Sequence, residues 1–366
     1  MKKTTIGFIG LGLIGGSIAK ALRTYHPDCH IIVYDLQKAS CRLALEEGVA
    51  DEAADSIGTA FSACDYIFLC APVTENDHNL QHLSSILSPQ CIITDVGSVK
   101  GTIHEQIRHL GLTDRFIGGH PMAGSERFGY PNAKARLLEN AYYILTPAEK
   151  ISASQLEDFQ ELIRYTKAIP LVLDPSEHDY VTAAISHLPH ILAASLVHLV
   201  RDQDSPDGTM KMIAAGGFKD ITRIASSSPH MWQQICLTNT DNILRLLDTY
   251  MEALRNMRSR LENKASDQLF DFFHEARTYR DSFVNTSGGP IKKSHSITVD
   301  IADETGALAT IATMLATKNI SIKNIGIVHN RELEEGALRI EFYEDEAVQT
   351  AGRILTEKGY HIYQKE

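Results

Sequence analysis

The stretch RFIGGHPMAGSE, residues 115–126, places His120 where an apolar run stops at two glycines and a proline follows. A histidine exchanges a proton near neutral pH, and flanking glycines let a ligand approach its ring closely. Pro121 fixes the backbone after the histidine and disfavours helix at His120 itself. We interpret His120 as a candidate proton acceptor; a histidine that only satisfies a loop is the alternative.

A second pattern with chemical meaning is Gly10, Gly12 and Gly15 in G-x-G-x-x-G order, after a strand pattern and at the start of a helical one. In that context the glycines permit a tight turn, close approach to a pyrophosphate and close packing of helix on sheet, and the helix N-terminus attracts the anion. Asp35 closes the next strand pattern, where a carboxylate binds a ribose diol and favours NAD over NADP. Lys38 nearby weakens that preference.

Later strand patterns end in CAPV and TDVGSVK, and ligands of open parallel sheets bind beyond the carboxyl ends of the strands. The same rule places His120 at this crevice. Ser98 lies near the nicotinamide half, or it serves as the N-cap of the following helix. The candidate cofactor-binding residues are Gly10, Leu11, Gly12, Leu13, Ile14, Gly15, Asp35, Ala71, Pro72 and Gly97.

The elements that must position these residues alternate along the first half of the chain. Apolar strand patterns, rich in Val, Ile and Leu, are separated by segments with apolar residues at helical spacing. This alternation predicts an α/β Rossmann-type dinucleotide-binding domain with a doubly wound, mostly parallel sheet over residues 1–174.

The pattern changes after residue 174. Residues 175–285 read as long helices with wide apolar stripes, which predicts an all-α dimerisation domain buried against itself or a second subunit. Residues 286–294 are rich in Gly, Pro and Ser and are the expected linker. Residues 295–366 return to a βαββαβ order, which predicts a ferredoxin-like two-layer sandwich.

Composition excludes several classes of function. The chain has 366 residues and a formal net charge of −11, which argues against a nucleic-acid or anionic-membrane partner. We find no secretory signal and no continuous apolar run of membrane-spanning length, so a cytoplasmic location is expected. The six cysteines show no metal-binding spacing, so we expect reduced thiols and no metal.

Six motifs in order, GLGLIGGS, DVGSVK, GGHPMAGSE, EHDY, SHLPH and FKDITRIASSSPHMW, closely resemble bacterial prephenate dehydrogenases, the TyrA family of tyrosine biosynthesis. The resemblance covers residues 1–285, and the stretch DETGALATIATMLATKNISIKNIGIVHN resembles an ACT domain, a module that binds amino acids. It implies NAD-dependent oxidative decarboxylation of prephenate to 4-hydroxyphenylpyruvate, without a metal. It also implies a homodimer through the helical domain, and ACT–ACT pairing.

The resemblance also implies roles for individual residues. His120 is the catalytic proton acceptor with Ser98 near it, and Arg223 grips a substrate carboxylate. His187 and His190 lie three apart around Pro189, and one of them contacts substrate or nicotinamide; His190 is favoured. The further candidates for lining or gating the substrate pocket are Glu126, His178, Asp179, Lys219, Asp220 and Trp232.

In the tail, L-tyrosine is the expected feedback inhibitor. The candidate effector residues are Asp303, Thr305, Gly306, Ala307, Leu308, Asn319 and Ile320. Two alternatives stay open: the module serves only dimerisation, or tyrosine competes at the prephenate pocket.

Three other functions compete with this interpretation. An arogenate dehydrogenase performs the same chemistry on a side-chain amine, and the sequence does not separate the two substrates. A β-hydroxyacid dehydrogenase shares the glycine loop but gives no reason for SHLPH. A non-catalytic NAD or amino-acid sensor would not need both His120 and Arg223.

Overall fold

The structure is a computed structural model that describes residues 3–124, 127–285, 295–301, 304, 306–328 and 336–363. The chain divides into two compact units, Met1–Ala265 and Ser266–Glu366. Residues 286–294, the predicted linker, lie outside the described residues.

The first unit opens with a five-stranded, wholly parallel sheet in the order β3-β2-β1-β4-β5. Its strands are β1 (Thr5–Ile9), β2 (His30–Tyr34), β3 (Glu52–Ala53), β4 (Tyr66–Leu69) and β5 (Ile92–Asp95). The chain order reverses beside β1, and ligands bind at such a switch point beyond the carboxyl ends of the strands. The predicted Rossmann-type parallel sheet is confirmed.

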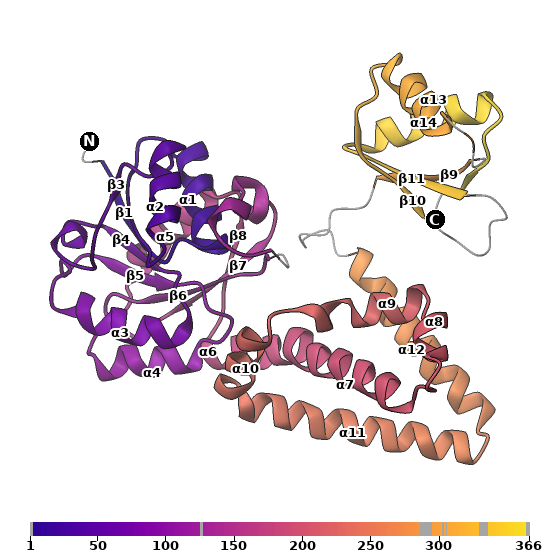
Figure 1. Cartoon of the computed structure of the whole chain (residues 1–366), viewed down its shortest axis with the longest axis horizontal. Helices are drawn as coiled ribbons and strands as arrows, with labels where there is room; N and C mark the ends of the chain where they lie inside the picture. Colours follow the sequence, from indigo (N-terminus) through magenta and orange to yellow (C-terminus); the bar gives the residue numbers. More distant parts are fainter. Residues whose placement is uncertain are drawn as a thin grey trace. The chain divides into compact units, whose positions relative to one another are not determined.

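Helices cover both faces of this sheet (Figure 1). One face carries α1 (Leu13–Tyr25), α2 (Lys38–Glu46) and α5 (Ala153–Tyr165), whose apolar sides join one buried cluster. The other face carries α3 (Val73–Ser84) and α4 (Gly101–His109) over a second cluster. The short 3-10 turns are η1 (Thr59–Phe61), η2 (Tyr130–Asn132) and η3 (Ala135–Leu138).

A smaller sheet brings His120 to the crevice. It consists of β6 (Ile117–Pro121), β7 (Tyr142–Pro147) and β8 (Ile169–Val172), with β6 antiparallel to β7. A parallel bridge between Ile93 and Phe116 joins the start of β6 to β5. The carboxyl ends of β5 and β6 therefore lie side by side, as the sequence predicts.

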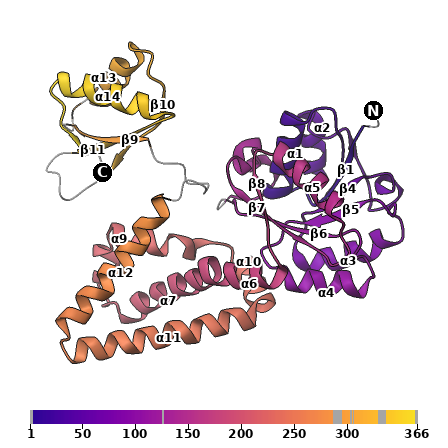
Figure 2. The same ribbon diagram turned by 180° about the vertical axis from the view of Figure 1, so that it is seen from behind.

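The helical part of the first unit starts with a continuous run of α6 (Pro175–Thr182), a π-helical turn η4 (Ala183–His187) and α7 (Leu188–Gln203). Pro189 lacks an N–H, and its ring displaces the carbonyl one turn earlier, which accounts for the wider turn just before it. The remaining elements are α8 (Thr209–Ile213), α9 (Gly216–Thr222), η5 (Arg223–Ser226), α10 (Pro229–Thr238) and α11 (Thr240–Glu262). In both ribbon views α6 lies beside α4 (Figures 1 and 2).

This helical part leaves much apolar surface uncovered by its own chain. The run Pro175–Gln203 is long and apolar enough to cross a membrane by length and composition alone. In this structure 22% of its most apolar window is buried. The same run carries the buried polar side chains His178 and Asp179, which hydrogen-bond to His120 of β6 and to the Lys100 amide at the start of α4. Its large exposed apolar residues are Tyr180, Ile185, Leu196, Val197 and Leu199.

The second unit contains α12 (Ser266–Asn285) and a βαββαβ module. The module consists of β9 (Ser296–Ile301), α13 (Ala307–Ala316), β10 (Ile322–Val328), β11 (Gly336–Phe342), α14 (Asp345–Glu357) and β12 (Ile362–Tyr363). Its antiparallel sheet has the order β10-β11-β9-β12. Helices α13 and α14 pack against this sheet, and together they enclose a separate hydrophobic core. The predicted two-layer sandwich is confirmed.

A buried ion pair ties β5, β6 and α4 together. Lys100 is 0% exposed, and its Nζ bonds the Asp95 carboxylate and donates to the Gly119 carbonyl at 2.7 Å. Asp95 also accepts from the amides of Gly97 at 2.9 Å and Gly119 at 3.1 Å. Both backbone groups of Gly119, the residue before His120, are thereby held.

We predict that Lys100→Met lowers the free energy of unfolding by about 3–5 kcal/mol, because it leaves a buried carboxylate without its cation. The double variant Lys100→Met/Asp95→Asn should recover part of that loss in chemical denaturation followed by circular dichroism. As a control, Arg108→Met breaks an ion pair that is more than half exposed on both sides and should change stability far less. Equal stability of Lys100→Met and the unaltered chain would contradict the anchoring role.

Candidate active site

The glycine loop between β1 and α1 has the geometry of a phosphate cradle. Gly10 has φ 92°, and a Cβ there would lie 2.5 Å from the Ala71 nitrogen. A Cβ on Gly15 would lie 2.6 Å from the Gly10 carbonyl oxygen. At Gly12, the N-cap of α1, a Cβ would meet no protein atom within 4 Å, and no side chain caps the helix. The loop therefore leaves open space in front of free helix amides, which fits a pyrophosphate.

Asp35 stands directly after β2 and faces this loop. Its carboxylate accepts from the Leu11 amide at 2.6 Å and from the Gln37 amide at 2.7 Å. The Lys38 ammonium donates to the carbonyls of Ala54 and Asp55 and lies over the Tyr34 ring, so it is held by other groups. A carboxylate at this position, with the neighbouring Lys38 engaged elsewhere, fits a ribose diol better than a 2′-phosphate.

His120, at the end of β6, is half-buried and hydrogen-bonded to a second histidine. Its Nδ1 lies 2.8 Å from Nε2 of His178 on α6, and Nδ1 of His178 lies 2.8 Å from the Asp179 carboxylate. That carboxylate also accepts from the amides of Lys100 at 2.7 Å and Gly101 at 2.8 Å, at the start of α4. Three side chains from two segments thus form one chain of hydrogen bonds.

The partners in this chain decide where the protons sit. A carboxylate only accepts, so Nδ1 of His178 carries a hydrogen, and in that tautomer Nε2 of the ring is an acceptor. His120 therefore donates from Nδ1 to His178 and presents Nε2 as an unprotonated acceptor. Burial, followed by the neighbouring His178 and the Lys100 cation, holds the pKa of His120 well below its usual range. The free nitrogen of His120 is thus available as a base at neutral pH.

A second group of rings lies around the π-helical turn. Burial lowers the pKa of His187 to about 4, and the ring meets Trp232 edge-on at 6.0 Å between centroids. His190, half-buried, stacks on the same indole with 3.5 Å between the ring centroids. Its Nδ1 lies 3.1 Å from the Ser186 carbonyl, so that nitrogen carries a hydrogen. His187 is close enough to His120 to contribute to its lowered pKa, so the two groups lie within electrostatic reach.

Comparison with known proteins agrees with this geometry. Residues 18–171 match the family described as "Prephenate dehydrogenase, nucleotide-binding domain", and residues 174–275 match "Prephenate dehydrogenase, dimerization domain". The prephenate dehydrogenase of Bacillus subtilis (strain 168) is 41% identical over 346 residues, which cover 94% of this chain and 93% of that protein. The chain belongs to the prephenate dehydrogenase family.

Two solved structures of relatives extend the comparison. The prephenate dehydrogenase of A. aeolicus, in complex with hydroxyphenyl propionate and NAD+, has a TM-score of 0.73 at 32% identity and covers 77% of this chain and 99% of its own. The arogenate dehydrogenase of Synechocystis has a TM-score of 0.70 at 31% identity, covering 76% and 100%. The expected family, Rossmann-type fold and NAD cofactor are confirmed.

Ser98 needs a correction within the family motif DVGSVK. The helix after this motif begins at Gly101 with Lys100 at the N-cap, so Ser98 is not its N-cap residue. The Asp179 carboxylate, from a distant helix, takes the capping role instead. Ser98 is half-buried beside the end of β5, and its role near the hydroxyl and nicotinamide stays a prediction.

The remaining substrate candidates are brought together only in part. Arg223, at the start of η5, is exposed and close enough to His190 for its charge to lower the pKa of that ring, after burial. Lys219 and Asp220, at the end of α9, are exposed. Glu126 lies outside the described residues.

Sequence reasoning missed three residues that hold this site. Asp95 and Lys100 stand inside a motif that is otherwise informative, but nothing local marks them as a buried pair. Asn239, at the junction of α10 and α11, is 4% exposed and donates to the Asp179 carbonyl at 2.8 Å. From the sequence, Asn239 would be interpreted only as the N-cap of the following helix, so its contact with Asp179 is missed.

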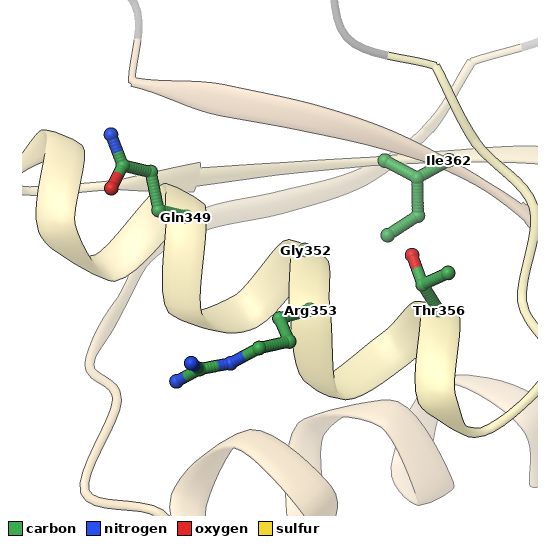
Figure 3. Close-up of a pocket in the computed structure, with 5 residues that line it drawn as sticks. All are labelled: Gln349, Gly352, Arg353, Thr356 and Ile362. Carbon is green, nitrogen blue, oxygen red and sulfur yellow. The ribbon is translucent and has the colours of Figure 1, made fainter.

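The predicted effector residues occupy two places in the second unit. Gly306, with φ 94°, and Leu308 stand at the start of α13, whereas Asn319, with φ 56°, and Ile320 follow its end. Asp303 and Thr305 lie outside the described residues. A separate shallow hollow of about 340 Å³ is lined by α14 and β12 (Figure 3). Its lining residues are Gln349, Gly352, Arg353, Thr356 and Ile362, so it does not coincide with the predicted effector residues.

We predict that Gly12→Ala leaves the melting temperature unchanged but raises the Kd for NAD about tenfold, because its Cβ enters only the pyrophosphate space. Gly10→Ala is the matched contrast. It forces a Cβ against the backbone of Ala71 at positive φ and should lower stability by about 1–3 kcal/mol or more. Thermal melting and cofactor titration separate the two effects; equal NAD binding in Gly12→Ala would contradict the cradle.

Proposed function

We propose that this chain catalyses the NAD-dependent oxidative decarboxylation of prephenate to 4-hydroxyphenylpyruvate, with His120 as the proton acceptor and L-tyrosine as a feedback inhibitor. The observation that carries the catalytic assignment is the hydrogen-bond chain from His120 through His178 to Asp179. It presents a neutral imidazole nitrogen at the carboxyl end of β6, next to the dinucleotide crevice.

The chemistry requires one base and a means of holding two carboxylates. The ring carbon that bears the hydroxyl loses a hydride, and the ring carboxylate departs as CO₂ while the ring becomes aromatic. The hydroxyl proton passes to the base during this step and returns to the phenolate oxygen afterwards, because the product keeps its hydroxyl. NAD, when bound, supplies the hydride acceptor. Nε2 of His120 takes the hydroxyl proton, and His178 with Asp179 stabilises the imidazolium that results. Ser98 lies near the same hydroxyl.

The substrate-binding candidates include a guanidinium, uncharged ring N–H donors, an ammonium and a carboxyl group. Arg223 grips a carboxylate, since its planar fork matches the two oxygens. His190 and Trp232 form a stacked wall beside it, and Trp232 Nε1 is buried without a hydrogen-bond partner among the described residues. His187, Lys219 and Glu126 complete the proposed set. A buried indole N–H without a partner is costly and supports a polar ligand there.

The cofactor is held by the loop after β1 and the ends of β2, β4 and β5. The amides of Gly12, Leu13 and Ile14 face the pyrophosphate, and the Leu11 amide holds Asp35, which binds the ribose. Ala71, Pro72 and Gly97 line the crevice. The open space at Gly12 and the crowding at Gly10 and Gly15 support this assignment.

The exposed apolar side chains of the helical part support a homodimer. A homodimer through the helical domain would cover its exposed apolar side chains, and the matched dimerisation domain spans the same residues. We place this homodimer in the cytoplasm, where the six free cysteines of each chain would stay reduced. Domain boundaries at 174, 285 and 294 remain part of this proposal.

Substrate preference is tested by steady-state assays with prephenate and arogenate, each with NAD and with NADP. Turnover of prephenate with NAD supports the proposal. Preferred turnover of arogenate would change the substrate, and no turnover of either would favour a binding protein.

We predict that His120→Asn lowers kcat by about 100-fold, because an amide has no basic nitrogen to take the proton. The KM for prephenate should change much less. In the unaltered enzyme, log kcat should stay flat as the pH falls past 6.5, the ordinary histidine pKa, because burial keeps His120 neutral to lower pH. An acid limb centred at 6.5, or an undiminished kcat in His120→Asn, would contradict the assignment.

Inhibition by tyrosine is assigned to the βαββαβ module. The two sets of effector residues flank α13, a helix of ten residues and thus about 15 Å long. One small ligand does not reach from one end to the other within one module, so contact with both sets requires two modules. The outer position of β10 in its sheet supports such ACT–ACT pairing.

Deleting residues 290–366 should abolish inhibition by tyrosine while prephenate turnover persists, since the first unit has its own cores. Initial rates at fixed prephenate with increasing tyrosine measure this. Inhibition that survives the deletion and competes with prephenate would move the tyrosine site to the active site.

A further inference from the structure

Asn239 occupies the N-cap position of α11, yet its side chain does not cap the helix. An N-cap asparagine usually accepts a hydrogen bond from an amide of the first turn. Here the residue has φ −123° and ψ 31°, and its amide points to other groups. With only 4% of the residue exposed, each of these bonds replaces a bond to water.

The orientation of this amide follows from its partners. Nδ2 lies 2.8 Å from the Asp179 carbonyl oxygen, and a carbonyl only accepts, so the atom facing it is the nitrogen. The same nitrogen lies 3.1 Å from Nδ1 of His187. Oδ1 accepts from Asn242 at 2.8 Å. Since both hydrogens of Nδ2 are donated, Nδ1 of His187 is an acceptor, and the hydrogen of this neutral ring sits on Nε2.

His187 is placed for this bond by the π-helical turn that it ends. Such turns occur often at functional sites because they shift the side chains that follow. The groups that act on this ring are Asp179 and His178 from α6 and His190 from α7, and Trp232 meets it edge-on. Burial outweighs the Asp179 carboxylate and keeps the ring neutral at physiological pH.

We propose that Asn239 is a positioning residue that holds His187 as a neutral Nε2–H donor to the substrate. The proposal rests on the proposed function, because it takes prephenate as the acceptor of that bond. His120 presents Nε2 as an acceptor and His187 presents Nε2 as a donor. Both orientations depend on Asp179, the first through its carboxylate and the second through its backbone carbonyl.

The first test reads the tautomer directly. In full-length protein with ¹⁵N-labelled histidine, the resonances of His187 are assigned by their loss in His187→Gln. We expect Nδ1 to have the shift of an unprotonated nitrogen and Nε2 that of a protonated one. In Asn239→Asp, a carboxylate replaces the donor, so Nδ1 should gain a proton. A protonated Nδ1 in the unaltered protein would overturn the proposal.

The second test is a double-mutant cycle on prephenate turnover. Asn239→Ala should raise the KM for prephenate about tenfold with a smaller effect on kcat, and it should have less than about a twofold effect in a His187→Ala background. Asn239→Asp should make KM depend on pH near neutrality, because its carboxylate raises the pKa of His187. An undiminished KM effect of Asn239→Ala without His187 would overturn the proposal.

The control is Thr240→Ala, whose exposed hydroxyl bonds the carbonyls of Cys236 and Leu237 within the helical chain. It should leave KM and the imidazole spectrum unchanged; a KM shift equal to that of Asn239→Ala would assign the effect to the helix junction and overturn the proposal. The spectrum is read without substrate. Failure of the proposed function, seen as an active His120→Asn, is therefore distinguishable from failure at Asn239.

Discussion

The carboxylate of Asp179 is the interaction on which the site depends. It accepts three hydrogen bonds, from the amides of Lys100 and Gly101 at the start of α4 and from the imidazole of His178. An anion is stabilised at a helix N-terminus, where unpaired amides and the helix dipole both favour it. A single side chain thus fastens the helical segment to the start of α4 and orients the His178 ring that leads to His120. The Asp179 carboxylate therefore both supports the proposed base His120 and attaches the helical segment.

What the sequence predicts well is local. The glycine loop is recognisable because its three glycines stand between a strand and a helix, and each conformational need falls within six residues. His120 is placed at the crevice because it ends a strand next to β5, a rule of topology that needs no knowledge of side-chain contacts. The helices, the sheet and the tail module follow from periodicity in the same way.

The sequence does not predict which side chains contact each other when they are far apart in the chain. The family motifs mark His178 and Asp179 only as polar residues of the pocket, and their partners stand 58 and 79 residues away. The pair of Asp95 and Lys100 has no pattern of its own, because charged residues are ordinarily assumed to be exposed. For Ser98, the alternative of a helix cap is wrong, because tertiary contact with Asp179 supplies that cap; its predicted role near the nicotinamide is untouched by this. The π-helical turn depends on Pro189 and on packing, so periodicity alone misses it.

The neutral state of the histidines has a physical reason under the proposed function. Prephenate carries two carboxylates, and one of them must leave as uncharged CO₂. A cation bound to the leaving carboxylate would stabilise the ground state more than the transition state, and so would slow the step it is meant to assist. A neutral donor orients the same group with a smaller penalty. Under the proposals above, a neutral His187, whose pKa burial lowers to about 4, suits the carboxylate that leaves, and the permanent charge of Arg223 suits the carboxylate that stays.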